Sequence, residues 1–198
     1  MQASPHQARS TIHDILTFWF EDPTGITAKR QKVWFIKTPE FDQTIRDRFS
    51  LIHQQASRGE FDDWMTTAPG CLALILVLDQ FSRHLFRQHP QAFATDAKAL
   101  AVAQHAIAQN FDQTLPKIQR WFLYMPFMHS EDLEIQRQSV ELFCLLADDP
   151  DASSAYPYAI KHHDVIQRFG RFPHRNAILG RINTPEETEF LQQPGSSF

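Results

Sequence analysis

Residues 69–87 read PGCLALILVLDQFSRHLFR, and this stretch decides the fold class. The seven residues from Leu72 to Leu78 are all apolar and leave no polar face. A helix that is apolar all round is packed on every side, so we predict that this one lies at the centre of the domain. Pro69 opens it at a position where the missing N–H of proline costs nothing.

Helical periodicity continues on both sides of this stretch. Ile12, Ile15, Leu16 and Trp19 follow the i, i+3, i+4, i+7 spacing of a core-facing helix. No Asn-Gly or Asp-Gly dipeptide marks a β-hairpin. We therefore predict a single all-α domain of eight or nine antiparallel helices arranged around the buried one.

Start and stop signals give the expected helix bounds. Pro126 is expected to end or kink the helix that begins at Pro116, and Ser130 is expected to cap the next one. Residues 148–154 hold three acids, a proline and two serines, which is typical of a loop. Thr184 begins a capping box with proline at the first helical position, which predicts a short last helix. The other predicted helices are residues 12–19, 39–58, 69–78, 96–108, 116–125, 130–146 and 157–169.

The composition fits one domain over residues 1–198, with residues 1–9 and 193–198 as tails. Of the 198 residues, 42% are apolar and 12% aromatic, and the net charge is only −4, which excludes a disordered chain. A mildly acidic chain without a basic stripe argues against nucleic-acid binding. With six glycines, no G-x-G-x-x-G and no Walker loop, we expect no nucleotide cradle and no cofactor.

Nothing in the sequence indicates a membrane or an exported protein. The apolar run from Leu72 to Leu78 has seven residues, whereas a bilayer needs about 20. The N-terminal residues show no signal-peptide pattern, and two cysteines do not form a disulfide framework. We expect a cytoplasmic protein.

Charged residues gather directly after the apolar helix, where Asp79 and Gln80 precede Arg83 and Arg87. Asp79 and Arg83 are four residues apart and can pair on one helical face. A functional interpretation makes both arginines the cationic floor of a pocket, oriented by Asp79 and Gln80. The alternative is an ion pair at a solvated helix end.

A second polar segment is His129-Ser130-Glu131-Asp132. Acids in the first turn of a helix are favoured by the helix dipole without any function. If the segment is functional, His129 and Glu131 can serve as a proton-transfer pair.

The third polar segment spans residues 162–181 and holds four arginines and three histidines against one aspartate. Gly170 breaks the helix where these cations gather. Because the planar fork of arginine suits carboxylate and phosphate, the segment is a candidate anion site. The alternative is that its arginines clamp carboxylates of neighbouring helices. The candidates here are His162 as a base, and Arg171, His174, Arg175 and Asn176 as ligand-binding residues.

The sequence lacks the motifs of nucleophilic and metal-dependent enzymes. There is no G-x-S-x-G elbow, and neither cysteine has a histidine nearby in the sequence. The histidines match no H-E-x-x-H pattern, so no metal site is predicted.

The motifs together resemble a bacterial family of unknown function, DUF924, over nearly the whole chain. The matching motifs are Leu78-Asp79-Gln80-Phe81 with Arg83, Phe93-Ala94-Thr95-Asp96, Tyr124-Met125-Pro126-Phe127, His129-Ser130-Glu131-Asp132, Arg168 to Asn176, Leu179-Gly180-Arg181 and Thr184 to Glu187. His84 stands where the family usually has Asn. The resemblance implies a tetratricopeptide-like helical fold and no established activity.

Three functions remain open at this point. The first is binding of a small anionic molecule or a peptide carboxylate in an Arg/His-rich pocket. The second is an enzyme, a hydrolase or lyase, in which His129 or His162 acts as base and arginines stabilise negative charge. The third is a scaffold that binds a protein partner, with the polar motifs acting only as clamps.

Overall fold

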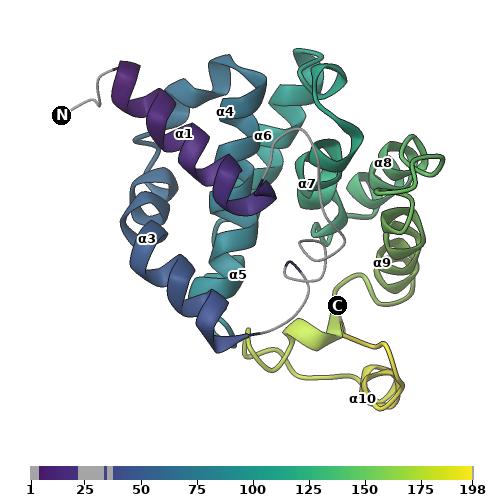
Figure 1. The fold of residues 1–198 in the computed structure, drawn as a ribbon. Helices are drawn as coiled ribbons and strands as arrows, with labels where there is room; N and C mark the ends of the chain where they lie inside the picture. Colours follow the sequence, from purple (N-terminus) through teal and green to yellow (C-terminus); the bar gives the residue numbers. More distant parts are fainter. Residues whose placement is uncertain (1–4, 22–33, 35–37, 198) are drawn as a thin grey trace.

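The structure is a computed structural model, and it describes residues 5–21, 34 and 38–197. All regular elements in these residues are helices, and no strand occurs among them (Figure 1). The α-helices are α1 (Pro5–Phe20), α3 (Pro39–Ser57), α4 (Ala68–Ile75), α5 (Ser82–Leu85), α6 (Asp96–Ala108), α7 (Lys117–Met128), α8 (Leu133–Cys144), α9 (Ala155–Phe169) and α10 (Pro185–Leu191). The predicted all-α class is confirmed.

The apolar stretch forms the buried centre of the domain, as predicted. Every residue from Cys71 to Ser82 is buried. The stretch is not one regular helix, however, because a π-helical segment, η2 (Leu76–Phe81), joins α4 to α5. The start of α4 depends on Gly70, whose N–H donates to the Thr67 hydroxyl at 3.2 Å. A Cβ on Gly70 would lie 2.0 Å from the Trp64 carbonyl oxygen, so only glycine fits there.

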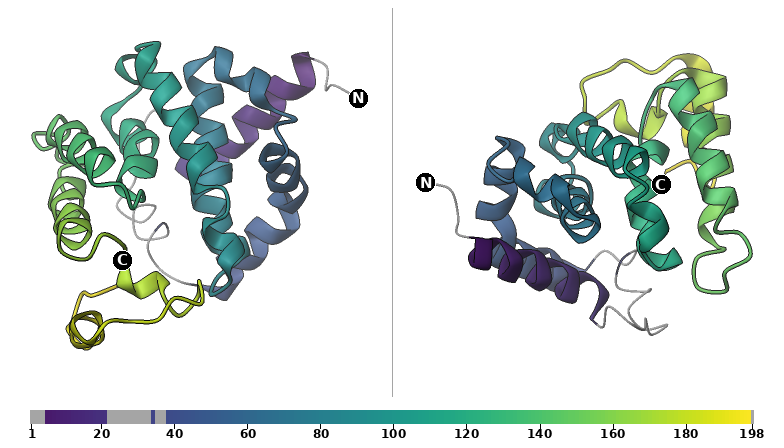
Figure 2. Two further views of the ribbon diagram at one scale, coloured as in Figure 1. Left: turned by 180° about the vertical axis from the view of Figure 1, so that it is seen from behind. Right: turned by 90° about the horizontal axis from the view of Figure 1, so that it is seen from above.

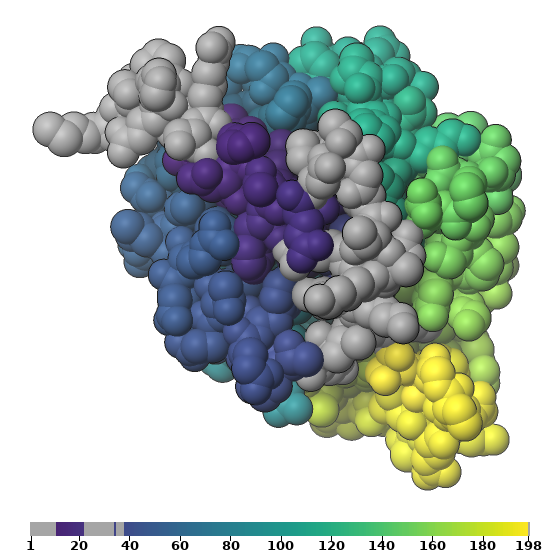
Figure 3. Space-filling view, viewed as in Figure 1, coloured from purple at the N-terminus to yellow at the C-terminus, as the bar shows by residue number. Residues whose placement is uncertain are grey.

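The other helices pack around this centre in order. α3 packs on η2 and α5, α1 packs on α4, and α6 and α7 cover the remaining sides. α8 lies against α7, and α9 against α8, so these two form the outer flank of the domain (Figures 1 and 2). In the space-filling view, α8 and α9 (green) form one edge and α10 (yellow) lies at the corner below them (Figure 3).

Several helix bounds differ from the predicted ones for local reasons. α7 runs through Pro126 to Met128, although the proline has no N–H to donate to the preceding turn, and only two residues follow it before the helix ends. The cap of α8 is Asp132 rather than Ser130: its carboxylate accepts the N–H groups of Glu134 and Ile135 at 2.8 and 3.1 Å. α9 starts at Ala155, so Pro157 falls inside the first turn, where its missing N–H is tolerated.

The two ends of the chain complete the fold. The predicted capping box is confirmed: the Thr184 hydroxyl accepts the Glu187 N–H, and the Glu187 carboxylate accepts the Thr184 N–H. α1 begins at Pro5, within the stretch predicted as a tail, while residues 1–4 lie outside the described residues. None of the described helices combines the length and apolarity that crossing a bilayer requires. The tetratricopeptide-like pairing stays a prediction.

Candidate functional site

Asp79 is a wholly buried carboxylate at the centre of the domain. It lies in η2, and its oxygens accept hydrogen bonds from His129 Nδ1 and Gln80 Nε2, each at 2.6 Å. The predicted pairing with Arg83 is present, at 3.2 Å. Burial alone would raise the pKa of Asp79, but the charge of Arg83 and the contact with His129 outweigh it and hold the pKa below its usual range. The carboxylate is therefore ionised.

His129 is oriented by this carboxylate. It caps the C-terminus of α7, and an ionised carboxylate can only accept hydrogen bonds, so Nδ1 of His129 carries the proton. Burial lowers the pKa of His129, and the charge of Arg83 lowers it further, so the ring is neutral at pH 7. Nε2 then holds a lone pair and has no hydrogen bond among the residues that the structure describes. This is the arrangement of a general base with its orienting acid.

Arg175 lies beside this pair. It is in the short 3₁₀ turn η5 (Pro173–Arg175), and it is 6% exposed. Its guanidinium lies over the rings of Phe93 and Phe172, 4.7 and 4.5 Å from their centroids. Nη2 donates to the His129 carbonyl at 3.0 Å. Nε is buried and has no hydrogen-bond partner in the described part of the chain.

The carboxylates near Arg175 are committed mainly to Arg83. Asp96 accepts two hydrogen bonds from Arg83, at 3.0 and 3.1 Å, but Nη1 of Arg175 reaches it only at 3.5 Å. Burial and the charge of Arg83 lower the pKa of Arg175 to about 10. Arg175 is thus a buried cation whose charge is incompletely balanced.

Two further histidines border Arg175. The ring of His162 lies 6.3 Å from that of His129, and its Nδ1 donates to the Tyr158 carbonyl at 2.7 Å. Burial lowers the pKa of His162 to about 3. Burial and the charge of Arg175 lower the pKa of His174 to about 3. Both rings are neutral at pH 7 and add no positive charge.

We refer to these residues as the central polar cluster. It draws on η2, α5, α6, the residue that follows α7, α9 and η5. Its members are Asp79, Gln80, Arg83, Asp96, His129, His162, His174 and Arg175.

Glu131 lies outside this cluster and is not the partner of His129. Its carboxylate accepts both ends of the Arg181 guanidinium, at 2.7 and 2.9 Å, and the Phe172 N–H at 2.8 Å. These contacts fix the loop after α9 onto the start of α8. Asp79, 50 residues before His129, orients its ring instead.

Arg171 and Asn176 hold the last helix in place. The carboxylate of Glu187 accepts two hydrogen bonds from Arg171, at 2.6 and 2.7 Å, and one from the Asn176 amide at 3.2 Å. The hydrogen bond from Arg171 lowers the pKa of Glu187 to about 2. These contacts form a clamp between the loop and α10.

Arg87 is likewise separate from the cluster. It donates to both oxygens of Asp42, at 2.7 and 2.6 Å, and so ties the residues after α5 to α3. His84 Nδ1 lies 2.7 Å from the same carboxylate. Asp42 is therefore shared by His84 and Arg87.

Sequence reasoning missed Asp96, Phe93 and Phe172 as parts of the site. The first two belong to the motif Phe93-Ala94-Thr95-Asp96, whose residue types do not by themselves indicate a site. In the part of the chain that the structure describes, no group of three His, Cys, Asp or Glu side chains has the geometry of a metal site.

Two of the comparisons with known proteins found a match. Residues 15–195 match the model described as "Bacterial protein of unknown function (DUF924)". A solved structure of a protein of unknown function, ATU0120 from Agrobacterium tumefaciens, is similar with a TM-score of 0.85 and 38% identity. The match covers 93% of this chain and 98% of that one. No curated protein matches the chain.

Proposed function

The chain belongs to the DUF924 family, whose description names no activity, and we propose from its own residues that it binds a small anionic ligand at the central polar cluster. The ligand is a carboxylate or a phosphate, either in a small molecule or at the end of a peptide. Arg175 is the residue that binds it.

The observation that carries this proposal is the unpartnered Nε of Arg175. A guanidinium has five N–H donors, and leaving one unpaired in a buried position costs roughly 1–3 kcal/mol or more. Here Nε has no partner in the described residues and Nη1 has only a 3.5 Å contact. An anionic oxygen would satisfy these donors and balance the charge.

The surroundings favour access from the side of Arg83 and Asp96. Their side chains keep 22% and 18% of their surface exposed, whereas that of Arg175 keeps 8%. The rings of Phe93 and Phe172 hold the guanidinium plane, so that its orientation is fixed before a ligand arrives. Preorganisation of this kind reduces the entropic cost of binding.

The proposal is tested by thermal denaturation in benzoate, citrate or inorganic phosphate at constant ionic strength. A ligand at a hundred times its Kd stabilises by about 2.7 kcal/mol. We expect Arg175→Met to abolish the response to the anion that stabilises the wild type. A tripeptide with a free carboxylate, compared with its amide, tests the peptide form of the ligand.

Arg171→Met is the matched control, because it removes a neighbouring arginine that is committed to Glu187. It should lower stability but keep the ligand response. If Arg175→Met fails to fold, Arg175→Lys keeps the charge and loses the planar fork, and it should bind at least tenfold more weakly. An equal response of the Arg175 variants and the wild type, or no response to any anion, would refute the proposal.

A second candidate function, an enzyme, is favoured by the contact between Asp79 and His129. A histidine held through Nδ1 by an ionised carboxylate presents Nε2 as a base, and Arg175 can stabilise negative charge that develops beside it. This fits a hydrolase or a lyase acting on an anionic substrate. Hydrolysis of 4-nitrophenyl hydrogen succinate is a direct probe. His129→Gln should abolish it, whereas His105→Gln, at a histidine bound to the Met65 carbonyl, should not.

A further inference from the structure

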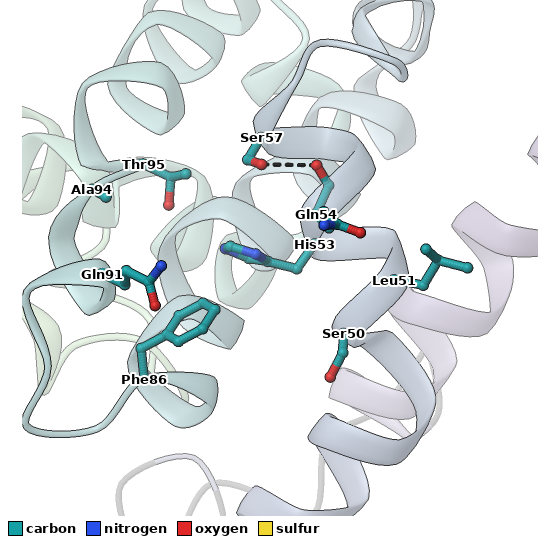
Figure 4. A pocket seen from close by; sticks show the side chains of 9 residues that line it. All are labelled: Ser50, Leu51, His53, Gln54, Ser57, Phe86, Gln91, Ala94 and Thr95. Carbon is teal, nitrogen blue, oxygen red and sulfur yellow. Dashed lines mark hydrogen bonds between the residues drawn. The ribbon is translucent and has the colours of Figure 1, made fainter.

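A second candidate site lies on the other side of the central helix, between α3 and the segment that joins α5 to α6. It is an open cleft of about 600 Å³, within the size range of small-molecule sites. Nine residues line it, and none of them is charged (Figure 4). This contrasts with the central polar cluster, and an uncharged cleft favours a neutral ligand because it offers no counter-charge for an ion.

His53 from α3 and Phe86 after α5 extend into this cleft (Figure 4). The two rings meet edge to face, with centroids 5.3 Å apart. Together with Ala94 and the aliphatic part of Gln91, they offer an apolar surface suited to a flat ring.

A chain of hydroxyl groups sets the tautomer of His53. Nε2 of His53 lies 2.6 Å from the Ser82 hydroxyl, which lies 2.8 Å from the Thr95 hydroxyl. Both hydroxyls also lie within hydrogen-bond distance of the Leu78 carbonyl, at 2.7 and 2.5 Å. If Ser82 donated to His53, the two hydroxyl hydrogens would have to satisfy four contacts. If instead Nε2 of His53 carries a hydrogen and donates it to Ser82, both hydroxyl hydrogens are free to be donated to the Leu78 carbonyl. Fewer contacts then lack a hydrogen, so we assign the proton to Nε2.

Nδ1 of His53 therefore carries a lone pair. It has no hydrogen bond within the residues that the structure describes, and the side chain is 6% exposed, at the inner wall of the cleft. Burial lowers the pKa of His53, so the ring stays neutral at pH 7. The cleft thus combines an apolar surface with one fixed hydrogen-bond acceptor.

From this geometry we propose that the cleft binds a small, uncharged aromatic molecule through one O–H or N–H group that donates to Nδ1 of His53. The site is separate from the proposed anion site, and its ligand belongs to a different chemical class. Ser82 is not a nucleophile here, because it is wholly buried and does not line the cleft.

Three probes that differ in one group test the proposal by ¹H–¹⁵N NMR titration. 4-Methylphenol carries the O–H donor, 4-methylanisole replaces the donor by a methyl ether, and 4-methylbenzoate is an anion. We expect 4-methylphenol to give saturable shifts at residues around His53. Binding of the ether should be at least tenfold weaker, and 4-methylbenzoate should not shift these residues.

Two variants show whether the cleft is the place of binding. Ala94 lines the cleft and is exposed, so Ala94→Phe fills the cleft without removing an internal contact. Ala97 is exposed and does not line it, so Ala97→Phe is the matched control. Ala94→Phe should weaken 4-methylphenol binding more than tenfold, and Ala97→Phe should leave it unchanged.

Each opposite result overturns the proposal. Equal binding of 4-methylphenol and 4-methylanisole would show that the ligand does not donate a hydrogen bond to His53. Unchanged binding in Ala94→Phe, or no binding of 4-methylphenol to the wild type, would remove the cleft as a site. Shifts around His53 caused by 4-methylbenzoate would show that the cleft takes anions, and they would leave the Arg175 proposal untouched.

Discussion

Asp79→Asn is the most informative single change, because Asp79 holds the central polar cluster together. The substitution keeps the size of the side chain and removes its charge. Its carboxylate faces N–H donors from His129, Gln80 and Arg83. An asparagine has only one oxygen, so its amide group would point N–H at one of these donors.

The expected loss in the free energy of unfolding depends on the burial of Asp79 and on the contacts that its partners keep. Removing one member of a buried ion pair costs roughly 3–5 kcal/mol when the other charge is left uncompensated. Arg83 keeps both oxygens of Asp96, so we expect the lower end, about 3 kcal/mol. For a domain of this size, that lowers Tm by about 6–12 °C.

The assay is urea and thermal unfolding of the wild type, Asp79→Asn and a surface control, Asp62→Asn. Asp62 pairs with Lys98 at 2.8 Å, but its side chain is 55% exposed. Exposed pairs contribute about 0–1 kcal/mol, so the control should change Tm by less than about 4 °C. Equal stability of Asp79→Asn and Asp62→Asn would refute the role given to Asp79.

The same comparison has a pH dependence of known sign. The folded pKa of Asp79 lies below the ordinary carboxyl value of 3.8, so its ionised form stabilises the fold. The advantage of the wild type over Asp79→Asn should be complete above pH 3.8 and should decline as the pH falls below it. An advantage that grew on acidification would contradict the assigned ionisation.

Three further predictions concern residues that support the site. The hydrogen bond from Arg171 lowers the pKa of Glu187 to about 2, so the stabilising effect of the ionised carboxylate is present above the ordinary pKa of 4.5 and lost as the pH falls toward 2. In urea unfolding, the stability of Glu187→Gln should therefore differ from that of the wild type at pH 7 and much less at pH 2. Gly70→Ala should destabilise the domain by about 3 kcal/mol or more in thermal unfolding, because the new methyl group meets the Trp64 carbonyl. Gly180→Ala is the control: its position is open with φ +67°, and it should cost only about 1–2 kcal/mol in the same experiment. Tyr124→Phe removes a 2.7 Å hydrogen bond to the buried Asp112 and should cost about 1.5–3 kcal/mol, whereas Tyr158→Phe, at a ring that is 52% exposed, should stay within about 0.5 kcal/mol by chemical denaturation.

The parts of the fold that follow from local sequence could be predicted. The absence of a polar face between Leu72 and Leu78 predicts a buried helix, and the structure confirms it. The Thr184 capping box is also a local signal, because its two hydrogen bonds join residues three apart. Burial pattern and caps act over one or two helical turns, and these are the distances that a sequence pattern describes.

The π-helical turn could not be predicted, because its sequence is typical of a regular helix. Pro126 shows the same limit from the opposite side, because a proline inside a helix usually kinks or ends it, and α7 nevertheless continues through Pro126. Neither feature follows from a local pattern, and packing against neighbours far away in the sequence is not visible in such a pattern.

For the candidate site, residue types were predictable and partners were not. The arginines predicted to line one pocket divide among several carboxylates: Arg87 binds Asp42, Arg171 binds Glu187, and Arg83 binds Asp79 and Asp96. Of the four arginines predicted to line the pocket, Arg175 alone keeps a buried donor without a partner among the described residues. The cleft beside His53 leaves no sign in the sequence, because His53 follows Phe49 and Ile52 on an ordinary apolar stripe, where a histidine is typical of a core position.

The π-helical turn lies between the two candidate sites and supports residues of both. A π-turn shifts the helical hydrogen-bond register, and it is often found at functional sites. In this turn, the Asp79 carbonyl accepts a hydrogen bond from Arg83 at 2.8 Å, and the Leu78 carbonyl accepts the hydroxyls of Ser82 and Thr95. The Asp79 carbonyl thus supports Arg83 of the central polar cluster, and the adjacent Leu78 carbonyl fixes the hydroxyl groups that orient His53. Because Thr95 and Asp96 are also adjacent, a shift in this turn would move both sites together.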